Sequence, residues 1–166
     1  MKMLLLAGLF VAGSIAACHK EEQAVAGVAQ TAVNAEHKAQ VTASERDQQR
    51  TQLQQIPLPT KSLYIDIHEA SAWANPFLSV GPDAITLRTS EGTPAARHQD
   101  QQIQLVDLAR AMASLPPSAW RYGRVVAVAE APQVNAKNLP KVRRNVEAAI
   151  QQLNDLGIVV QDWPAR

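Results

Sequence analysis

The chain has 166 residues, of which 46% are hydrophobic and 19% are charged, as expected for one globular domain. The net charge of +1 and the aromatic content of 4% argue against an electrostatic nucleic-acid binder and against a stacking platform for single strands. The single cysteine excludes an intramolecular disulfide and a zinc site built on several thiolates.

The N-terminal segment has the layout of an export signal. Lys2 supplies a positive charge, and residues 3–15 are apolar or small throughout. This run is too short to cross a bilayer, which requires about 20 residues, but it has the length of the apolar region of a signal peptide. Taken alone, it also fits an ordinary secretory signal with a chance cysteine, or a buried N-terminal helix.

The apolar run ends in the tetrapeptide Ile15-Ala16-Ala17-Cys18. It resembles the lipobox of bacterial lipoproteins, in which an aliphatic residue and two small residues precede an invariant cysteine. The resemblance implies that acyl chains such as palmitate on Cys18 anchor the protein in a membrane of the cell envelope. In that family an aspartate after the cysteine retains the protein in the inner membrane. His19 stands at that position here, so the outer membrane is expected.

The resemblance and the composition divide the chain into three parts. Residues 1–17 are the expected lipoprotein signal peptide. Residues 18–59 are rich in Ala, Gln and Glu, which favour helix but offer little apolar surface to bury. We expect a disordered or partly helical tether there, with a helix docked on a partner as the alternative. The Ile-Pro-Leu-Pro sequence at 56–59 ends the tether, because two prolines stop a helix, and the folded domain is expected over 60–166.

Hydrophobic periodicity predicts the elements of this domain. Apolar residues alternate with polar ones at 63–68 and 84–89, and they recur every three or four residues between 139 and 153. The predicted elements, in chain order, are a strand over 63–68, a hairpin over 77–89, a helix over 101–115 capped by Asp100, a strand over 124–129, a helix over 139–156 and a strand over 158–160. Residues 90–99 are expected to form a loop.

The predicted order β-ββ-α-β-α-β indicates a small α+β domain with a mixed sheet and two helices on one face. The last strand–helix–strand unit should cross over right-handed and place its strands parallel. The Val-Val-Ala-Val run at 125–128 and the following helix, which ends in Leu156-Gly157-Ile158, are similar to the periplasmic domains of biopolymer-transport and Tol-type proteins. That likeness concerns the architecture alone and carries over no site residue.

Catalytic signatures are absent from the sequence. It contains no Gly-rich phosphate loop, no H-E-x-x-H and no G-x-S-x-G motif, so no cofactor and no resident metal is expected. Asp66, His68 and Glu69 cluster at the end of the first predicted strand. They favour either a solvated strand face or, as the alternative function, a periplasmic enzyme or metal-binding protein.

Aromatic and basic residues provide a second set of candidates. A tryptophan beside an arginine is typical of interface hot spots. The alternatives are that the rings cap a thin core and that the basic residues form the exposed face of a helix. The candidate partner-binding residues are Trp73, Phe77, Trp120, Arg121, Tyr122, Lys141, Arg143 and Arg144. The sequence therefore favours a non-enzymatic, lipid-anchored envelope protein whose periplasmic domain binds a protein or a cell-wall component such as peptidoglycan. An inhibitor or immunity protein is one such form.

Overall fold

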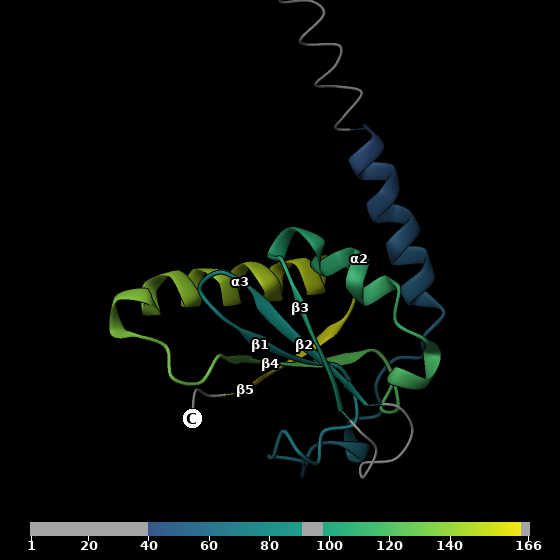
Figure 1. Cartoon of the computed structure of the whole chain (residues 1–166). Coiled ribbons are helices and arrows are strands. Elements are labelled where there is room, and N and C mark those ends of the chain that lie inside the picture. Colours follow the sequence, from purple (N-terminus) through teal and green to yellow (C-terminus); the bar gives the residue numbers. More distant parts are fainter. Residues whose placement is uncertain (1–39, 91–97, 164–166) are drawn as a thin grey trace, which may run out of the picture. The chain divides into compact units, whose positions relative to one another are not determined.

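The computed structural model describes residues 40–90 and 98–163. The chain divides into two compact units, Met1–Ser44 and Glu45–Arg166, and the elements below belong to the second unit (Figure 1). Residues 45–54 are helical. The strands and longer helices that follow are β1 (Phe77–Val80), β2 (Ile85–Ser90), β3 (His98–Ile103), α2 (Leu108–Ala113), β4 (Val125–Glu130), α3 (Leu139–Asp155) and β5 (Val159–Trp163). Short 3-10 helices lie at Lys61–Leu63, Leu105–Asp107, Pro117–Ala119 and Ala136–Asn138.

The described strands form one five-stranded mixed sheet in the order β3-β2-β1-β4-β5. The pairs β1–β2 and β2–β3 are antiparallel, whereas β1–β4 and β4–β5 are parallel. The predicted parallel pairing is confirmed, because α3 connects two parallel neighbours in which Val125 lies opposite Val159. The α+β class with a mixed sheet is therefore confirmed.

Helices α2 and α3 cover the same face of the sheet (Figure 1). Alternate residues of a strand point to opposite faces, so Leu78 and Val80 of β1 share this face with Val126 and Val128 of β4, and all four are fully buried. They belong to one core cluster with helix side chains from α2 (Leu108 and Met112) and from α3 (Ala149 and Leu153). The prediction of two helices on one face is confirmed.

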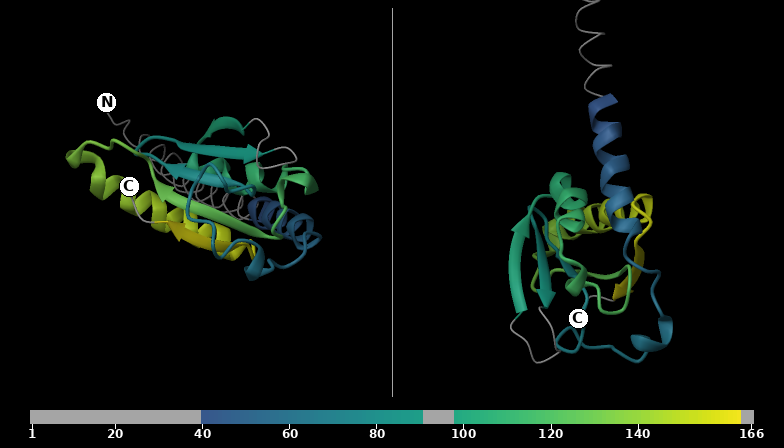
Figure 2. Two further views of the ribbon diagram at one scale, coloured as in Figure 1. Left: turned by 90° about the horizontal axis from the view of Figure 1, so that it is seen from below. Right: turned by 90° about the vertical axis from the view of Figure 1, so that its right-hand side faces the viewer.

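The opposite face of the sheet carries an aromatic layer. It is covered in part by a mostly irregular segment, residues 60–76, that lies across the sheet from the helices (Figure 2). The rings of Tyr64, Trp73, Phe77, Tyr122 and Trp163 pack edge to face or tilted, with centroid separations from 5.4 to 6.1 Å. Such pairs contribute about 0.5–1.5 kcal/mol each beyond the area they bury, so this small second core holds the segment on the sheet.

A buried asparagine ties the same segment to the start of β4. Asn75 is only 1% exposed. Its Nδ2 donates to the carbonyl oxygens of Gly123 (2.7 Å) and Val125 (2.8 Å), and its Oδ1 accepts from the backbone N–H of Tyr122 (2.8 Å). The amide therefore satisfies three backbone groups that the aromatic layer shields from water.

Part of the predicted tether belongs to the folded unit, which begins at Glu45 rather than at the predicted residue 60. Leu53, from the helix over 45–54, is 1% exposed and belongs to the same core cluster as the buried side chains of α2 and α3. Its carbonyl oxygen accepts from Arg124 Nη1 (3.2 Å), and the carbonyl oxygen of Pro57 accepts from the backbone N–H of Arg124 (2.8 Å). One buried leucine and two hydrogen bonds thus attach this segment to the domain.

The structure does not describe the N-terminal features predicted from the sequence. The lipobox, the signal-peptide prediction and residues 18–39 of the predicted tether lie outside the described residues. None of the helices among residues 40–90 and 98–163 has the length and the apolar character needed to span a bilayer.

The predicted strand over 63–68 is wrong. Residues 61–63 form a 3-10 helix, and 64–69 make no strand. The burial is the reverse of the predicted pattern, because Leu63 and Ile65 are about half exposed (54% and 49%) while Tyr64 between them is buried. Aromatic packing of Tyr64 against Trp73 outweighs the alternation, and none of the described strands pairs with this segment.

The region from 98 to 115 also differs from the prediction. Residues 98–103, expected as loop and helix start, form the edge strand β3, and the helix is confined to α2 after a 3-10 turn. Asp100 therefore caps no helix. The strand is polar because both its faces are largely exposed at the sheet edge, and Ile103 is its one buried residue. Pairing with β2 along six residues stabilises a segment whose side chains carry no strand signal.

Candidate ligand-binding cleft

The four aromatic candidates from the sequence are buried rather than displayed. Trp73, Phe77, Trp120 and Tyr122 are between 1% and 9% exposed. Trp120 lies in the core on the helix side, and the other three lie in the aromatic layer. This burial favours the alternative in which the rings complete a thin core over a displayed binding surface, and of the four only Phe77 also lines the cleft described below. A domain with few aromatic residues uses them to complete both cores.

The basic candidates are exposed, but they do not converge on one site. Lys141 Nζ pairs with Asp83 Oδ1 at 2.7 Å, and Arg143 Nε lies 3.8 Å from Glu130 Oε1. Arg144 is exposed on the same helix, whereas Arg121 is exposed in the turn before β4. The α3 residues form the polar side of an amphipathic helix whose apolar side contacts the sheet.

Asp66, His68 and Glu69 are all exposed on the irregular segment. Glu69 Oε2 accepts from the hydroxyl of Ser71 at 3.5 Å. Within the described residues, no group of three or more His, Cys, Asp or Glu side chains is arranged to hold a metal ion. The described structure thus gives no support to the alternative metal site.

A cleft of about 450 Å³ opens on the sheet face that carries the aromatic layer. This volume lies within the usual range for small-ligand sites, roughly 300–1,000 Å³. The cleft takes its lining from four strands and three positions outside them: Ala70, Phe77, Ser79, Thr86, Arg88, Ala129, Glu130, Ala131, Pro132 and Trp163. The irregular segment contributes only Ala70, so the hollow lies where that segment leaves the sheet uncovered.

Small side chains in register create the hollow. Ser79 of β1 lies opposite Thr86 of β2 on one side and Ala129 of β4 on the other, and Ala129 lies opposite Trp163 of β5. A row of three short side chains across neighbouring strands leaves a depression, and Phe77 and Trp163, whose ring centroids are 5.4 Å apart, form an aromatic wall beside it. The register therefore places two hydroxyls on an otherwise apolar floor.

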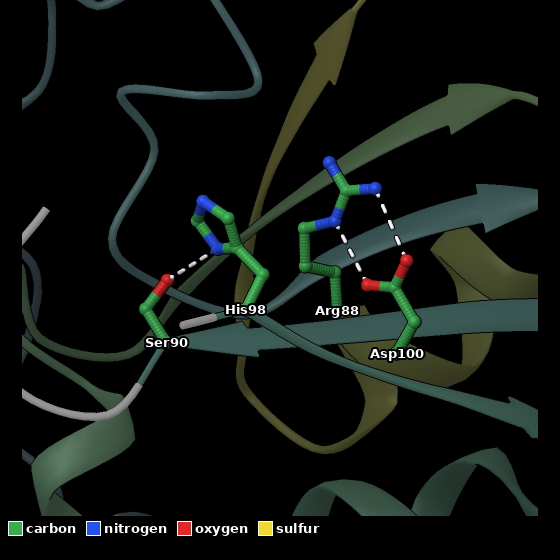
Figure 3. A network of polar contacts seen from close by, with 4 residues as sticks. All are labelled: Arg88, Ser90, His98 and Asp100. Carbon is green, nitrogen blue, oxygen red and sulfur yellow. Dashed lines mark hydrogen bonds and ion pairs between the residues drawn. The ribbon is translucent and has the colours of Figure 1, made fainter. Parts of the chain in front are cut away.

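Arg88 is the cationic residue of the lining, and its position is fixed by a neighbour. Its Nε and Nη2 donate to Oδ1 (2.9 Å) and Oδ2 (3.2 Å) of Asp100, on the adjacent strand β3 (Figure 3). The hydrogen bonds from Arg88, followed by the positive charges of Arg88 and His98, hold the pKa of Asp100 below its usual value against the opposing effect of desolvation. The same hydrogen bonds raise the pKa of Arg88. This forked pair orients the guanidinium while leaving Nη1 unused by Asp100.

A second polar pair lies next to the first on the same two strands. Ser90 Oγ and His98 Nδ1 are 3.0 Å apart (Figure 3). A serine hydrogen-bonded to a histidine is the arrangement that activates a nucleophile. Ser90, however, is only 2% exposed and does not line the cleft. The pair closes the β2–β3 ladder at its end.

A larger hollow of about 770 Å³ lies between residues 45–57 and residues 110–120. Its walls include four exposed or half-exposed glutamines, Gln48, Gln49, Gln52 and Gln55. Such long side chains lose much rotamer freedom when they are ordered against a ligand. In the cleft on the sheet the floor is made of short side chains, and the larger Phe77, Trp163 and Arg88 are held by ring contacts or an ion pair, so this cleft is the better candidate.

The sequence did not identify the residues of this cleft as a site. Alternation at 84–89 placed Thr86 and Arg88 among the polar positions of the predicted hairpin, but that signal marks a solvated strand as readily as a ligand site. Searches against protein-family models, curated proteins and solved structures find no match for this chain.

Proposed function

We propose that this protein is a lipid-anchored protein of the bacterial cell envelope, and that its folded domain binds a protein or cell-wall partner at the cleft on the sheet. The observation that carries the binding proposal is the cleft itself, which joins an apolar floor and an aromatic wall to an oriented guanidinium. Sites of this kind, mostly apolar with a few placed polar groups, are typical of ligand recognition.

The anchor is proposed from the sequence motif. One acyl chain gives only marginal membrane binding, whereas two or more give stable attachment. Acylation of Cys18 on sulfur and amine would therefore hold the protein at the membrane, and His19 favours the outer membrane. Residues between Cys18 and Glu45 would separate the lipid from the folded unit.

We propose binding rather than catalysis because both charged side chains of the cleft lining are already in ion pairs. Arg88 is paired with Asp100, and Glu130 lies near Arg143. Ser90, the one serine beside a histidine in this region, is buried. The lining therefore offers hydrogen-bond donors in fixed positions and no exposed nucleophile beside a base.

The lipid proposal is tested by Cys18→Ser in the native host. The variant should lose labelling by a palmitate analogue and accumulate as the uncleaved precursor. Normal processing of the variant would show an ordinary signal peptide instead. Fractionation of the wild-type protein between inner and outer membranes checks the expected location.

The binding proposal is tested by photo-cross-linking in intact cells. A photoreactive residue at Pro132, an exposed lining residue beyond the end of β4, should give a discrete cross-linked species without filling the floor of the cleft. The same residue at Gln151, exposed on α3 on the other side of the sheet, serves as the matched control. Equal patterns from the two positions, or cross-links from Gln151 alone, would refute recognition through the cleft.

A further inference from the structure

We infer that the cleft recognises the C-terminal residue of a peptide, with its free carboxylate held by Arg88 and its apolar side chain placed against the aromatic wall. This inference rests on the proposed binding function and specifies the chemistry of the partner. It follows from the hydrogen-bonding groups, the charge and the apolar surface of the lining.

The polar groups that face the cleft are mainly donors. The guanidinium of Arg88 uses Nε and Nη2 on Asp100, and Nη1 points away from that carboxylate (Figure 3). The hydroxyls of Ser79 and Thr86 come from the neighbouring register positions, and in the described part of the chain no side-chain hydrogen bond engages either of them. A carboxylate has only acceptor oxygens, so it matches these three groups.

The charge of the lining agrees with this match. Glu130 also lines the cleft, but alternation along β4 places its side chain on the helix side with Val126 and Val128, and its carboxylate lies 3.8 Å from Arg143 of α3. Asp100 stands on β3, outside the lining. Arg88 is therefore the cationic group of the lining; Asp100, 2.9 Å away, offsets part of its charge and holds its planar group in position before a ligand arrives. Such preorganisation reduces the entropy lost on binding.

The apolar part of the lining selects what is attached to the carboxylate. Phe77 and Trp163 pack at 5.4 Å, and Trp163 also packs on Trp73 at 5.6 Å, so the wall is held from behind. Ala129 and Pro132 continue the apolar surface. A peptide C-terminus places an apolar side chain one carbon from its carboxylate and adds an N–H, which a hydroxyl that also accepts can bind. These groups together fit the three kinds of surface in the cleft.

The test uses two probes that differ only in charge at the C-terminus, acetyl-Ala-Ala-Leu with a free carboxylate and the same tripeptide as its amide. Binding to the full-length chain carrying Cys18→Ser is followed by amide chemical shifts in NMR spectra. The free acid should shift resonances of β1, β2 and β4, and the amide should bind at least tenfold more weakly. Equal binding of the two probes would overturn the inference.

Variants locate the interaction. Arg88→Gln should weaken binding of the free acid at least tenfold. Arg110→Gln is the control: Arg110 is an exposed arginine of α2 that pairs with Asp107, and its replacement should leave binding unchanged. Thr86→Val, which keeps the shape of the side chain, should weaken it severalfold, and Ala129→Leu should abolish it by filling the hollow. Undiminished binding in Ala129→Leu, with native circular dichroism, would place the carboxylate elsewhere.

The inference and the proposed function can fail separately. If cleft cross-links persist when the partner's C-terminal carboxylate is blocked, the cleft binds a partner but does not read its terminus. If position 132 gives no cross-link that position 151 lacks, the binding function itself fails.

Discussion

Replacement of the buried amide of Asn75 by a methyl group should lower the free energy of unfolding of the domain substantially. Asn75→Ala removes two hydrogen bonds to the carbonyl oxygens of Gly123 and Val125 and one from the N–H of Tyr122, all between 2.7 and 2.8 Å. A hydrogen bond contributes about 1 kcal/mol net, and a buried group left without a partner costs more. The expected loss in the free energy of unfolding is about 3–4 kcal/mol.

Urea denaturation of the purified chain, followed by far-UV circular dichroism, measures this loss as a lower midpoint with an unchanged slope. Asn145→Ala is the matched control. Its Nδ2 also donates to two carbonyl oxygens, of Gly81 (2.9 Å) and Pro82 (3.0 Å), but the residue is only half-buried and water can replace it. The control should cost about 1 kcal/mol or less.

A second substitution separates lost hydrogen bonds from lost packing. Asn75→Asp keeps the size of the side chain and the acceptor for Tyr122, but it turns a carboxylate oxygen toward the carbonyl oxygens of Gly123 and Val125. It should be strongly destabilising at pH 7 and less so as the pH falls, because a protonated carboxyl regains one donor. If Asn75→Ala costs no more than Asn145→Ala, the account of the buried amide is refuted.

Three further substitutions probe other contacts. Gly123→Ala should cost more than 2 kcal/mol by urea denaturation, because its φ is +84° and a Cβ would lie 2.7–2.8 Å from backbone atoms, whereas Gly157→Ala (φ +74°, nearest atom 3.9 Å) should cost about 1 kcal/mol; equal costs would contradict the packing argument. Arg88→Gln should lower stability by about 0.2–1 kcal/mol at pH 7. Because the folded-state pKa of Asp100 is lowered, this difference should be present above pH about 4 and shrink as the pH falls through the folded pKa; a difference that stays constant as the pH is lowered would contradict it. Leu53→Ala should cost about 2–4 kcal/mol by the same denaturation assay, and a smaller loss would mean that residues 45–54 contribute little to the folded unit.

Local periodicity predicted much of the fold. The apolar positions of α3 recur at helical spacing because one side of the helix meets the sheet, and the continuous apolar run of β4 reflects burial on both faces. In each case the pattern along the chain and the tertiary environment agree, so the element can be predicted from its own residues.

The elements that were missed depend on distant partners. Residues 63–68 alternate like a strand, yet Tyr64 is held by Trp73 and Tyr122 in the aromatic layer, and the segment pairs with no described strand. Residues 98–103 look like a polar loop, yet backbone pairing with β2 makes them a strand whatever their side chains. Neither outcome is encoded in local periodicity.

The candidate site shows the same division. Ser79, Thr86 and Ala129 are unremarkable residues in sequence, and they form a cleft floor only because three strands align them. The aromatic candidates were identified as the main aromatic area of the domain, but the sequence left open whether they bind a partner or cap a thin core. Composition does not tell which rings a small core will enclose.

The sequence by itself determined the class of the domain, the positions of its long helix and central strands, and the lipobox-like motif at Cys18, because each depends on short-range pattern or on a contiguous motif. Only the tertiary structure decided the edge strand, the burial of Trp73, Phe77, Trp120 and Tyr122, the inclusion of Leu53 in the core, and the cleft beside Arg88. Those features arise from strand register and from packing between segments far apart in the chain, which no local pattern specifies.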